Sequence, residues 1–316
     1  MKQLLINSEG LETRAALIED GKLENYFIER SDEHHIVGSI FKGVIRNLEP
    51  SLQAAFVDIG AGKNAFLHYW DMLPATQDML EEESDQPTHE QQRAPQSTDN
   101  QEAQGQGQQS AGVLASLRRK FRREVKDEQP RDRGGRRGRG RGRSRQKTRT
   151  SNYTIEEIPS LFPVNSEILV QVTKGPIGTK GARVTTNLSL PGRFVVLLPN
   201  SSHVGVSKRI EDRKERDRLR QILRKLPLPS NMGVICRTVG AGKKESTFRQ
   251  DVEFILGEWE KAEQRIKNDR APCCVYEEPH LAERVLRDYL TENVDEIVSD
   301  APEIQELAVN LSRRTR

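Results

Sequence analysis

Residues 38–71 constrain the fold of this chain more than any other stretch. Apolar and polar residues alternate from Ile40 to Ile45, a turn follows at Glu49-Pro50-Ser51, and the alternation resumes in AAFVDIG. A Gly-rich turn then leads to a last short run, AFLHY. Short alternating runs with turn residues between them are typical of consecutive antiparallel strands. We therefore expect a β-meander of three strands here.

Two phenylalanines of this meander, Phe56 and Phe66, lie near the ends of neighbouring predicted strands. Four side chains that can carry positive charge lie among them: Lys42, Arg46, Lys63 and His68. Rings that stack on bases, beside cations that contact phosphates, make the kind of surface that binds single-stranded nucleic acid. The alternative is that both rings fill the core of a small barrel, and spacing alone favours this alternative because Phe is usually buried.

The composition suits a protein of two or three domains, because the chain has 316 residues, 34% of them hydrophobic and 31% charged. No apolar run approaches the roughly 18 residues of a membrane span, and the N-terminal MKQLLINSEG lacks the apolar core of a signal peptide. We therefore expect a cytoplasmic protein. Its three cysteines, Cys236, Cys273 and Cys274, fit neither a disulfide framework nor the spacing of metal ligands, so we expect reduced, buried thiols.

Residues 75–151 have a composition typical of disorder, first acidic and Gln-rich, then basic, with the Arg-Gly run RGGRRGRGRGRSR at 133–145. Residues 117–149 contain 16 Lys or Arg and four acidic residues, so this tract carries +12 while the rest of the chain sums to −9. A flexible polycation of this kind attracts RNA phosphates without needing a fold. A linker that only improves solubility is the alternative.

Strand patterns on both sides of this segment complete the predicted β-structure. Residues 2–30 contain three strand-like runs with an Asp-Gly turn, and we assign them to a separate sheet because their pattern differs from that of the meander. Order is expected to resume at Asn165, where SEILVQV and RVTTNLSL flank a Gly-rich loop at 175–181. These two strands would close a five-stranded barrel with the meander, and the disordered segment would be an insert in a barrel loop.

The remaining sequence alternates strands and helices. GRFVVLLP predicts a buried strand, residues 212–226 a helix with an apolar stripe, and GVICRT another strand. A second helix is expected from Thr247, where Thr247 and Gln250 fit a capping box, and we interpret Trp259 on its apolar face as a core residue. The end of the chain is predicted to form a strand at CCVYEE, a helix at 281–290, a strand at DEIVSD and a helix at 302–313. We expect this unit to be incomplete, because a parallel unit of this size would leave its sheet uncovered.

Few residues suggest chemistry. No nucleophilic triad is recognisable, and the six histidines lack metal-ligand spacing. GAGK at 240–243 lacks the other residues of a phosphate-binding P-loop. Arg237 and Thr238, at a strand end before this Gly-rich turn, form a candidate anion pocket, with a solvated strand end as the alternative. Glu277 and Glu278 are expected on an exposed turn, solvated rather than catalytic.

Four separated segments resemble, in their order, the bacterial ribonuclease E and ribonuclease G family: LLIN, EPSLQAAFVDIG, GARVTTNLSLPGRFVVLLPN and RTVGAGK. The resemblance implies an α+β multidomain fold, with an S-one-type OB-fold β-barrel and an α/β sensor subdomain inserted in a split ribonuclease-H-like domain. The split domain would comprise residues 1–37 and 283–316, the barrel domain 38–190, and the sensor 191–282. The insert at 75–151 has no equivalent in the family pattern.

The resemblance also implies roles for individual residues. Phe56, Phe66 and Lys180 match positions that hold single-stranded RNA, and Lys42 joins them as a candidate from the meander surface. In the sensor, Arg237 and Thr238 match the pair that binds a 5′ monophosphate, with further matches at Gly192, Val196 and Lys208. Lys208 stands where the family often has Arg, so it keeps the charge but loses the bidentate fork.

Family members cut RNA with a Mg²⁺ ion held by two Asp residues in a later subdomain, and they join subunits through zinc at a later Cys-x-x-Cys. No Asp of this sequence matches those ligands, so the sequence predicts no catalytic residue, no metal site and no activity of this chain alone. We interpret it as the RNA-binding N-terminal part of a ribonuclease E/G-type endoribonuclease of RNA processing and decay. Its expected partners are single-stranded RNA and either further copies of the chain or a separate catalytic segment. A non-catalytic RNA-binding protein that retains the barrel and the sensor is the alternative.

Overall fold

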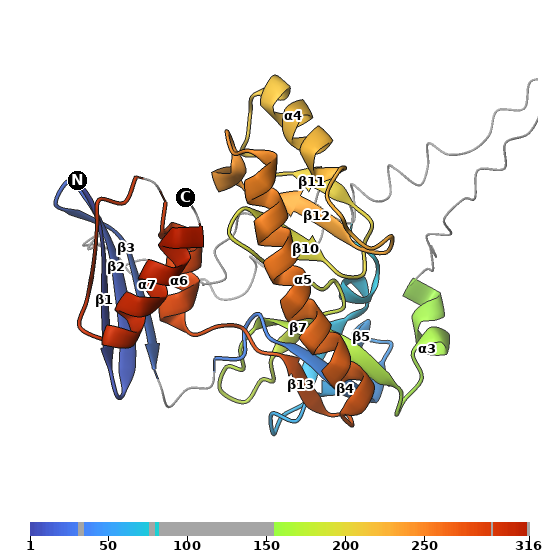
Figure 1. Cartoon of the computed structure of the whole chain (residues 1–316). Helices are drawn as coiled ribbons and strands as arrows, with labels where there is room; N and C mark the ends of the chain where they lie inside the picture. The colour runs from blue at the N-terminus through green and yellow to red at the C-terminus, as the bar shows by residue number, and fades with distance from the viewer. Residues whose placement is uncertain (31–34, 76–79, 82–154, 292, 315–316) are drawn as a thin grey trace, which may run out of the picture. The chain divides into compact units, whose positions relative to one another are not determined.

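The computed structural model describes residues 1–30, 35–75, 80–81, 155–291 and 293–314, and its helices and strands form three sheets with packed helices (Figure 1). The prediction of a mixed α+β protein is confirmed. Most of the segment predicted to be disordered, 75–151, lies outside the described residues. Leu80 is an exception, because it is buried in a cluster with Val196, Leu198 and Ile235. Placing the start of the disordered segment at residue 75 was therefore too early.

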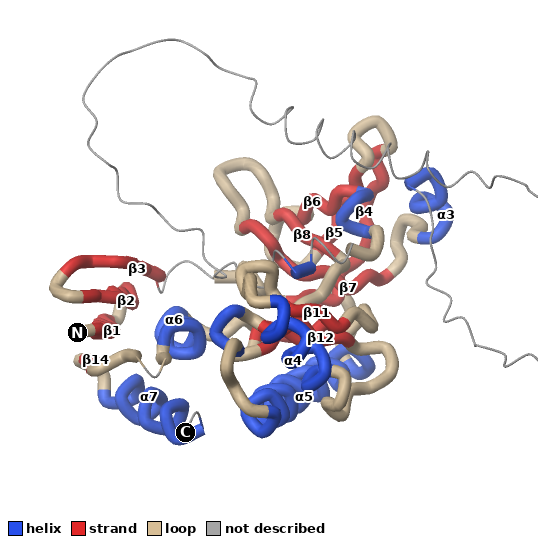
Figure 2. The backbone as a smooth tube through the Cα atoms, turned by 90° about the horizontal axis from the view of Figure 1, so that it is seen from above, coloured by secondary structure: helices blue, strands red, loops and turns tan. Residues whose placement is uncertain are grey.

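Five strands close into the predicted barrel: β4 (Ile40–Glu49), β5 (Ala54–Asp58), β6 (Ala65–His68), β7 (Glu167–Lys174) and β8 (Arg183–Thr185). The order is β4-β5-β6-β8-β7, and β7 pairs back with β4. All pairs are antiparallel except β6 with β8, and Figure 2 shows these strands grouped together. Alternate residues such as Val57, Leu67 and Val184 fill the barrel interior. The alternation of apolar and polar residues in the sequence thus corresponds to side chains that point alternately into and out of the barrel.

Short helices of the barrel region were not predicted. A 3₁₀ turn, η1 (Tyr69–Met72), follows β6, and η2 (Ile155–Glu157) and α3 (Ile158–Leu161) precede β7. The prediction that order resumes at Asn165 was wrong, since Ile158 is fully buried in the barrel core. A four-residue helix is too short to give a helical period in the sequence.

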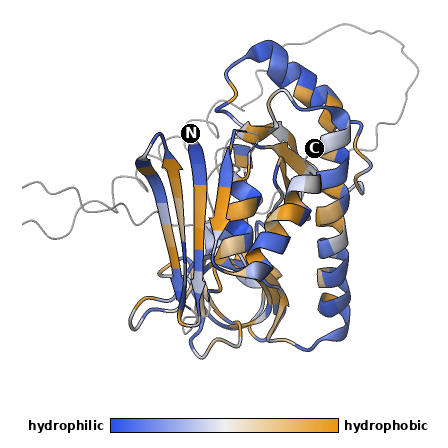
Figure 3. Cartoon of the chain, turned by 60° about the vertical axis from the view of Figure 1, so that its left-hand side comes forward, coloured by the Kyte–Doolittle hydropathy of each residue, from blue (hydrophilic) through white to orange (hydrophobic). Residues whose placement is uncertain are grey.

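Both ends of the chain contribute to a second sheet, of order β14-β1-β2-β3. Its strands are β1 (Lys2–Glu9), β2 (Glu12–Glu19), β3 (Lys22–Arg30) and β14 (Glu296–Ser299), and β14 runs parallel to β1. Figure 3 shows apolar and polar residues alternating along the strands beside the N-terminus. The helices α6 (Leu281–Tyr289) and α7 (Pro302–Arg314) share a core with these strands through residues such as Leu4, Leu286 and Ile304.

The strand, helix, strand and helix predicted at the end of the chain are confirmed, but the expectation that they form one parallel unit was wrong. The first strand, β13 (Cys273–Tyr276), pairs antiparallel with β4 and so extends the barrel sheet, whereas the second strand, β14, lies in the other sheet. The two strands therefore do not form one parallel unit, and the expected incompleteness does not arise from them.

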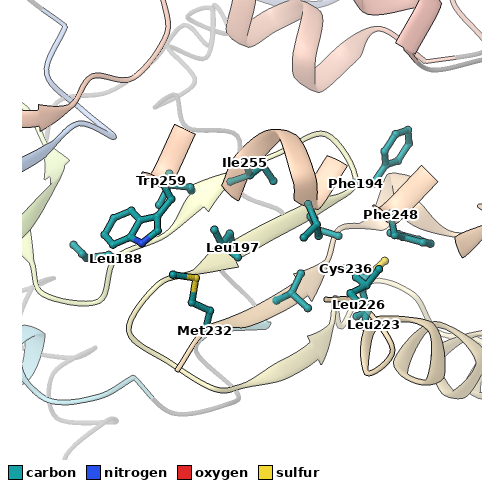
Figure 4. Close-up of a cluster of buried hydrophobic side chains, with 14 of the residues drawn as sticks. Leu188, Phe194, Leu197, Leu223, Leu226, Met232, Cys236, Phe248, Ile255 and Trp259 are labelled. Carbon is teal, nitrogen blue, oxygen red and sulfur yellow. The ribbon is translucent and has the colours of Figure 1, made fainter. Parts of the chain in front are cut away.

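The third sheet has the order β11-β12-β10-β9. It comprises β9 (Leu190–Pro191), β10 (Val195–Leu198), β11 (Val204–Val206) and β12 (Gly233–Cys236), and it packs with α4 (Arg213–Leu223) and α5 (Glu245–Asn268). Figure 4 shows the shared core, in which Leu197 and Ile255 lie close to Trp259, and the core role predicted for Trp259 is confirmed.

The start of α5 differs from its prediction. Lys244 is the N-cap residue and its side chain makes no capping hydrogen bond, so the predicted capping box of Thr247 and Gln250 was wrong. Both residues lie inside the first turns of the helix. A 3₁₀ turn, η3 (Thr238–Gly240), connects β12 to the segment before α5. Among the described residues, no helix is long and apolar enough to cross a membrane.

Candidate functional site

Phe56 and Phe66 form a pair of rings on the outside of the barrel. They are direct partners in the β5–β6 register, and their ring centroids lie 6.0 Å apart at an interplanar angle of 75°. Their strand neighbours, including Val57 and Leu67, point into the barrel core, and neither Phe belongs to it. The alternative that both rings are core residues was therefore wrong. His68 continues the row, with its ring 6.3 Å from that of Phe66.

Cations surround this aromatic face, which we define as Phe56, Phe66 and His68. Arg183 of β8 is the register partner of Phe66, and its half-exposed side chain is 3.0 Å from Asp71. Lys180 is exposed in the loop between β7 and β8. The strand beside the rings thus carries one cation that the sequence did not predict, Arg183, and its charge is paired with that of Asp71.

The loop that carries Lys180 is tied to the turn between β5 and β6. Lys63 Nζ donates a hydrogen bond of 2.6 Å to the carbonyl oxygen of Gly178. The backbones of Ile177 and Lys180 bond to each other at 2.9 and 3.2 Å. A Cβ on Gly181 would lie 2.0 Å from the carbonyl oxygen of Asn64, so only glycine allows this close approach. The loop is therefore held in place beside the aromatic face.

Lys42 lies elsewhere and has internal partners. Its ammonium group is 3.0 Å from a carboxylate oxygen of Glu167 and 3.1 Å from the carbonyl oxygen of Asp269. Only 14% of its side chain is exposed. The structure therefore does not bring Lys42 to the ring pair as the sequence-based interpretation expected, because its charge is already balanced at the junction of β4 and β7.

Arg237 follows β12 and is largely buried, with 8% of the residue exposed. Its Nη1 donates hydrogen bonds to the carbonyl oxygen of Gly192 at 2.7 Å and to Asp288 Oδ1 at 2.6 Å. None of the described residues accepts a hydrogen bond from its Nε or Nη2. The Nε–Nη2 edge of a guanidinium matches two oxygens of a phosphate or carboxylate. Arg237 is thus fixed through one nitrogen and keeps a complete edge available for an anion.

Asp288, which holds Arg237, belongs to a buried group of alternating charges. Arg287 Nε lies 3.2 Å from Asp288 Oδ1, and Arg287 Nη1 lies 2.9 Å from Glu278 Oε1. Burial raises the pKa of Asp288, but the charges and hydrogen bonds of Arg287 and Arg237 outweigh burial, so this pKa is below its ordinary value. The side chain of Glu278 is fully buried, so the prediction that it is solvated was wrong.

The turn that presents the Gly192 carbonyl is fixed by Asp251 of α5. The Asp251 carboxylate accepts backbone N–H groups of Arg193, Phe194 and Val195 at 2.8 to 3.1 Å. Burial raises the pKa of Asp251, and the three N–H donors oppose this rise. The sequence did not predict a role for either Asp251 or Asp288.

The other residues predicted for the anion pocket lie close by in the chain or the sheet. Thr238 follows Arg237 directly and is half-buried at the start of η3. Lys208 is exposed and follows Ser207, whose N–H bonds to the carbonyl oxygen of Cys236 at 2.9 Å. Val196 contributes its side chain to the cluster with Leu80, so packing is its visible role.

Two further cations lie beside this pocket, around the ring of Phe194. Arg193 Cζ is 5.1 Å and Lys243 Nζ 5.9 Å from its ring centroid. Phe194 follows Gly192, whose carbonyl oxygen accepts from Arg237, by two residues. The sequence alone did not indicate either of these two cations.

No described part of the chain brings together three or more His, Cys, Asp or Glu side chains that could hold a metal ion. Cys274 is half-buried, and burial raises the pKa of its thiol to about 11. A thiol with that pKa is protonated at neutral pH and is a poor nucleophile. Cys274 is therefore not an activated thiol.

Comparison with known proteins agrees with this description. The sequence model described as "Ribonuclease E/G family" matches residues 189–315, which include Gly192, Arg237 and Asp288. Ribonuclease G of Escherichia coli K12 is 32% identical over 299 residues, 95% of this chain and 47% of that protein. The chain belongs to the ribonuclease E/G family.

Other members of the ribonuclease E/G family show similar relationships. Ribonuclease G of Haemophilus influenzae is 33% identical over 95% of this chain and 47% of its own length. Ribonuclease E of Escherichia coli K12 is 31% identical over 98% of this chain and 23% of its own length. The chain thus spans about half the length of its ribonuclease G relatives.

Proposed function

We propose that this chain binds single-stranded RNA on the aromatic face and holds the RNA 5′ monophosphate at Arg237, as the RNA-binding part of a cytoplasmic endoribonuclease of RNA processing and decay. The observation that carries the proposal is the outward pair Phe56–Phe66, flanked by cations. Both rings are half-buried, and bases that stack on them would remove their remaining apolar surface from water, which is favourable.

The topology of the barrel supports an S-one-type OB fold for residues 38–190. The cyclic order β4-β5-β6-β8-β7, with β6 and β8 parallel, is that of a five-stranded OB barrel. In such barrels the second and third strands and the loop between the fourth and fifth bind oligonucleotides. Phe56 and Phe66 lie on the second and third strands, and Lys180 lies in that loop.

The free edge of Arg237 supports recognition of a 5′ monophosphate in the proposed sensor, residues 191–282. A terminal phosphate offers two oxygens to Nε and Nη2, whereas a 5′ hydroxyl offers no anion. Because Gly192 and Asp288 already fix the guanidinium, little side-chain freedom remains to be lost on binding. Thr238 and Lys208 are the proposed additional contacts.

The pairing of β1 with β14 supports a split ribonuclease-H-like domain made from residues 1–37 and 283–316, because it joins both segments in one sheet. Cleavage of RNA by this family would use Mg²⁺, and zinc would link subunits. The described residues do not fit either metal, so we assign no step of hydrolysis to them. The proposal therefore concerns how RNA is held.

The double variant Phe56→Ala/Phe66→Ala tests the aromatic face. Stacking contributes about 1–3 kcal/mol per base, so this variant should bind a 5′-hydroxyl single-stranded RNA at least about tenfold more weakly in a fluorescence anisotropy titration. Phe254→Ala, at a half-exposed Phe of α5, is the matched control and should bind as the unaltered chain does. Unchanged binding by the double variant would contradict the proposal.

A further inference from the structure

Helix α4 carries an excess of positive charge that faces solvent. Residues 213–225 contain seven Lys or Arg and two acidic residues. Four exposed side chains of this segment have no hydrogen bond or ion pair with any described residue: Arg213, Lys214, Arg224 and Lys225. Arg220 has only a 3.7 Å contact with Asp217. We call these five cations the α4 basic face.

Helix α5, the other helix that packs on this sheet, has no such excess of positive charge. Its residues include four cations and six acidic residues. Each of the four cations has an acidic partner three or four residues away: Arg249 with Glu245, Lys261 with Glu258, Arg265 with Asp269, and Lys267 with Glu263. The exposed cations of α5 thus form ion pairs with acidic residues one turn away, whereas four of the five cations of the α4 basic face do not form one with any described residue.

Some of the charges of α4 do not serve the stability of the helix. Arg213 and Lys214 occupy its first turn, where the helix dipole disfavours cations. Arg216 and Arg220, and Arg220 and Arg224, are like charges four residues apart, and such pairs destabilise a helix. Arg220 and Arg224 also lie at the C-terminal end of the helix, where the dipole favours cations. A polyanion bound along the helix would relieve the repulsion between the cations.

Helix α4 is joined to the turn after Arg237 by two hydrogen bonds. Arg218 Nη1 donates to the carbonyl oxygen of Lys243 at 3.1 Å, and Glu215 accepts from the N–H of Gly242 at 2.8 Å. Both loop residues follow Arg237 and Thr238 in the same turn region. On the other side, the N–H of Ser207 bonds to the Cys236 carbonyl oxygen at 2.9 Å. Figure 1 shows α4 beside the β11 and β12 end of this sheet.

We propose that the α4 basic face binds the phosphate backbone of RNA beyond the 5′ end, as a second RNA-binding surface separate from the barrel. The helix has 11 residues and is about 16 Å long, which accommodates several phosphates at about 3.4 Å per stacked nucleotide. Binding of this kind reads charge and not sequence. The inference rests on the proposed function in one respect: the RNA that reaches α4 is taken to have its 5′ end at Arg237.

The test compares two sets of four substitutions in the full chain. The α4 set is Arg213→Gln, Lys214→Gln, Arg224→Gln and Lys225→Gln. The control set removes the same number of charges from α5 by Arg249→Gln, Lys261→Gln, Arg265→Gln and Lys267→Gln. Affinity for a 20-nucleotide single-stranded RNA, with a 5′ monophosphate or a 5′ hydroxyl, is measured at several salt concentrations, together with the Tm of each variant.

The α4 set should weaken binding of both RNAs and flatten the plot of log K against log salt by about 0.7 for each phosphate that is no longer neutralised. Its ratio of affinities for the two RNAs should stay unchanged. Its Tm should change little, because Arg213 and Lys214 lie at the end of the helix where the dipole disfavours cations, and Arg224 and Lys225 lie at the end where it favours them. The α5 set should leave the salt slope unchanged.

An unchanged slope in the α4 set would overturn the inference and would favour an acidic protein as the partner of this face. Equal losses of affinity in both sets would also overturn it, since they would reflect net charge alone. If the unaltered chain shows no preference for the 5′ monophosphate while the α4 set still flattens the slope, the proposed role of Arg237 fails and the α4 inference stands.

Discussion

The Nη1 atom of Arg237 lies 2.6 Å from Oδ1 of Asp288, and this contact joins the residue after β12 to helix α6. Both side chains are at least nine-tenths buried. The carbonyl oxygen of Gly192 accepts from the same nitrogen, so three distant segments of the chain fix one guanidinium. The positions of its remaining nitrogens are thereby set before any ligand arrives, which is what a selective anion site requires.

The variant Arg237→Lys should lose the preference for 5′-monophosphorylated over 5′-hydroxyl RNA. A lysine ammonium can still contact Asp288 and preserve the buried charge, but it cannot offer the Nε–Nη2 edge to a phosphate. Affinity for 5′-hydroxyl RNA should stay within about twofold, since that RNA has no phosphate at this position. The two affinities are measured in parallel by anisotropy. A variant that keeps the full preference would contradict the 5′-phosphate assignment of Arg237.

Removing the charge of Asp288 should lower the free energy of unfolding. Asp288→Asn leaves Arg237 and Arg287 with Glu278 as the one acidic partner in this buried group, and breaking such a group costs about 3–5 kcal/mol. Urea denaturation followed by circular dichroism measures the loss. Glu296→Gln is the control, because Glu296 is exposed on β14 and its variant should lose little stability.

The difference in unfolding free energy between the unaltered chain and Asp288→Asn should depend on pH. The folded-state pKa of Asp288 is below its ordinary value of about 3.9, so its stabilisation is complete well above that value. As the pH falls through the lower folded-state pKa, the carboxylate becomes protonated and the stabilisation is lost. The difference in unfolding free energy between the unaltered chain and Asp288→Asn should therefore be constant above about pH 5 and shrink below about pH 4. A difference that stays constant down to pH 3 would show that the charge of Asp288 is not the source.

The sequence predicted features whose signal is local. Barrel closure is an example, because the strands before and after the insert share the same alternation, so neighbouring residues carried the information. The outward place of Phe56 and Phe66 is not, because the usual burial of Phe made the core the favoured interpretation from spacing alone. The family resemblance favoured an RNA-binding surface there.

The partners of two late strands were not indicated by the strands' own residues. The strand β14 pairs with β1 from the other end of the chain, and β13 pairs with β4. Only the family resemblance placed residues 1–37 and 283–316 in one domain. Asp288 and Asp251 were missed because the groups they bind lie 51 to 58 residues away. A weak signal existed at Asp288, because it adjoins Arg287 on a helix whose neighbours Leu286 and Leu290 are buried.

A methyl group at position 192 should disturb both the fold and the phosphate preference. A Cβ on Gly192 would lie 2.3 Å from Ile255 Cδ1 and 2.7 Å from Asp251 Oδ2. Gly192→Ala must therefore shift these side chains or the turn that they hold, whose carbonyl accepts from Arg237. Overpacking of this kind costs about 1–3 kcal/mol. The expected result is a lower Tm together with a reduced preference for 5′-monophosphorylated RNA.

Ile255→Val provides the matched rescue, because it removes Cδ1, the atom nearest to the added methyl group. The double variant Gly192→Ala/Ile255→Val should recover part of the Tm and part of the phosphate preference, and the remaining deficit should reflect the contact with Asp251. Ile255→Val alone should cost about 0.5–1.5 kcal/mol and leave the preference unchanged. If the double variant regains Tm but not the preference, stability and phosphate recognition are separate effects, and recognition requires the Gly192 carbonyl oxygen in its original place beside Arg237. If Gly192→Ala alone keeps the full preference, the hydrogen bond from Arg237 to Gly192 is not needed for phosphate recognition.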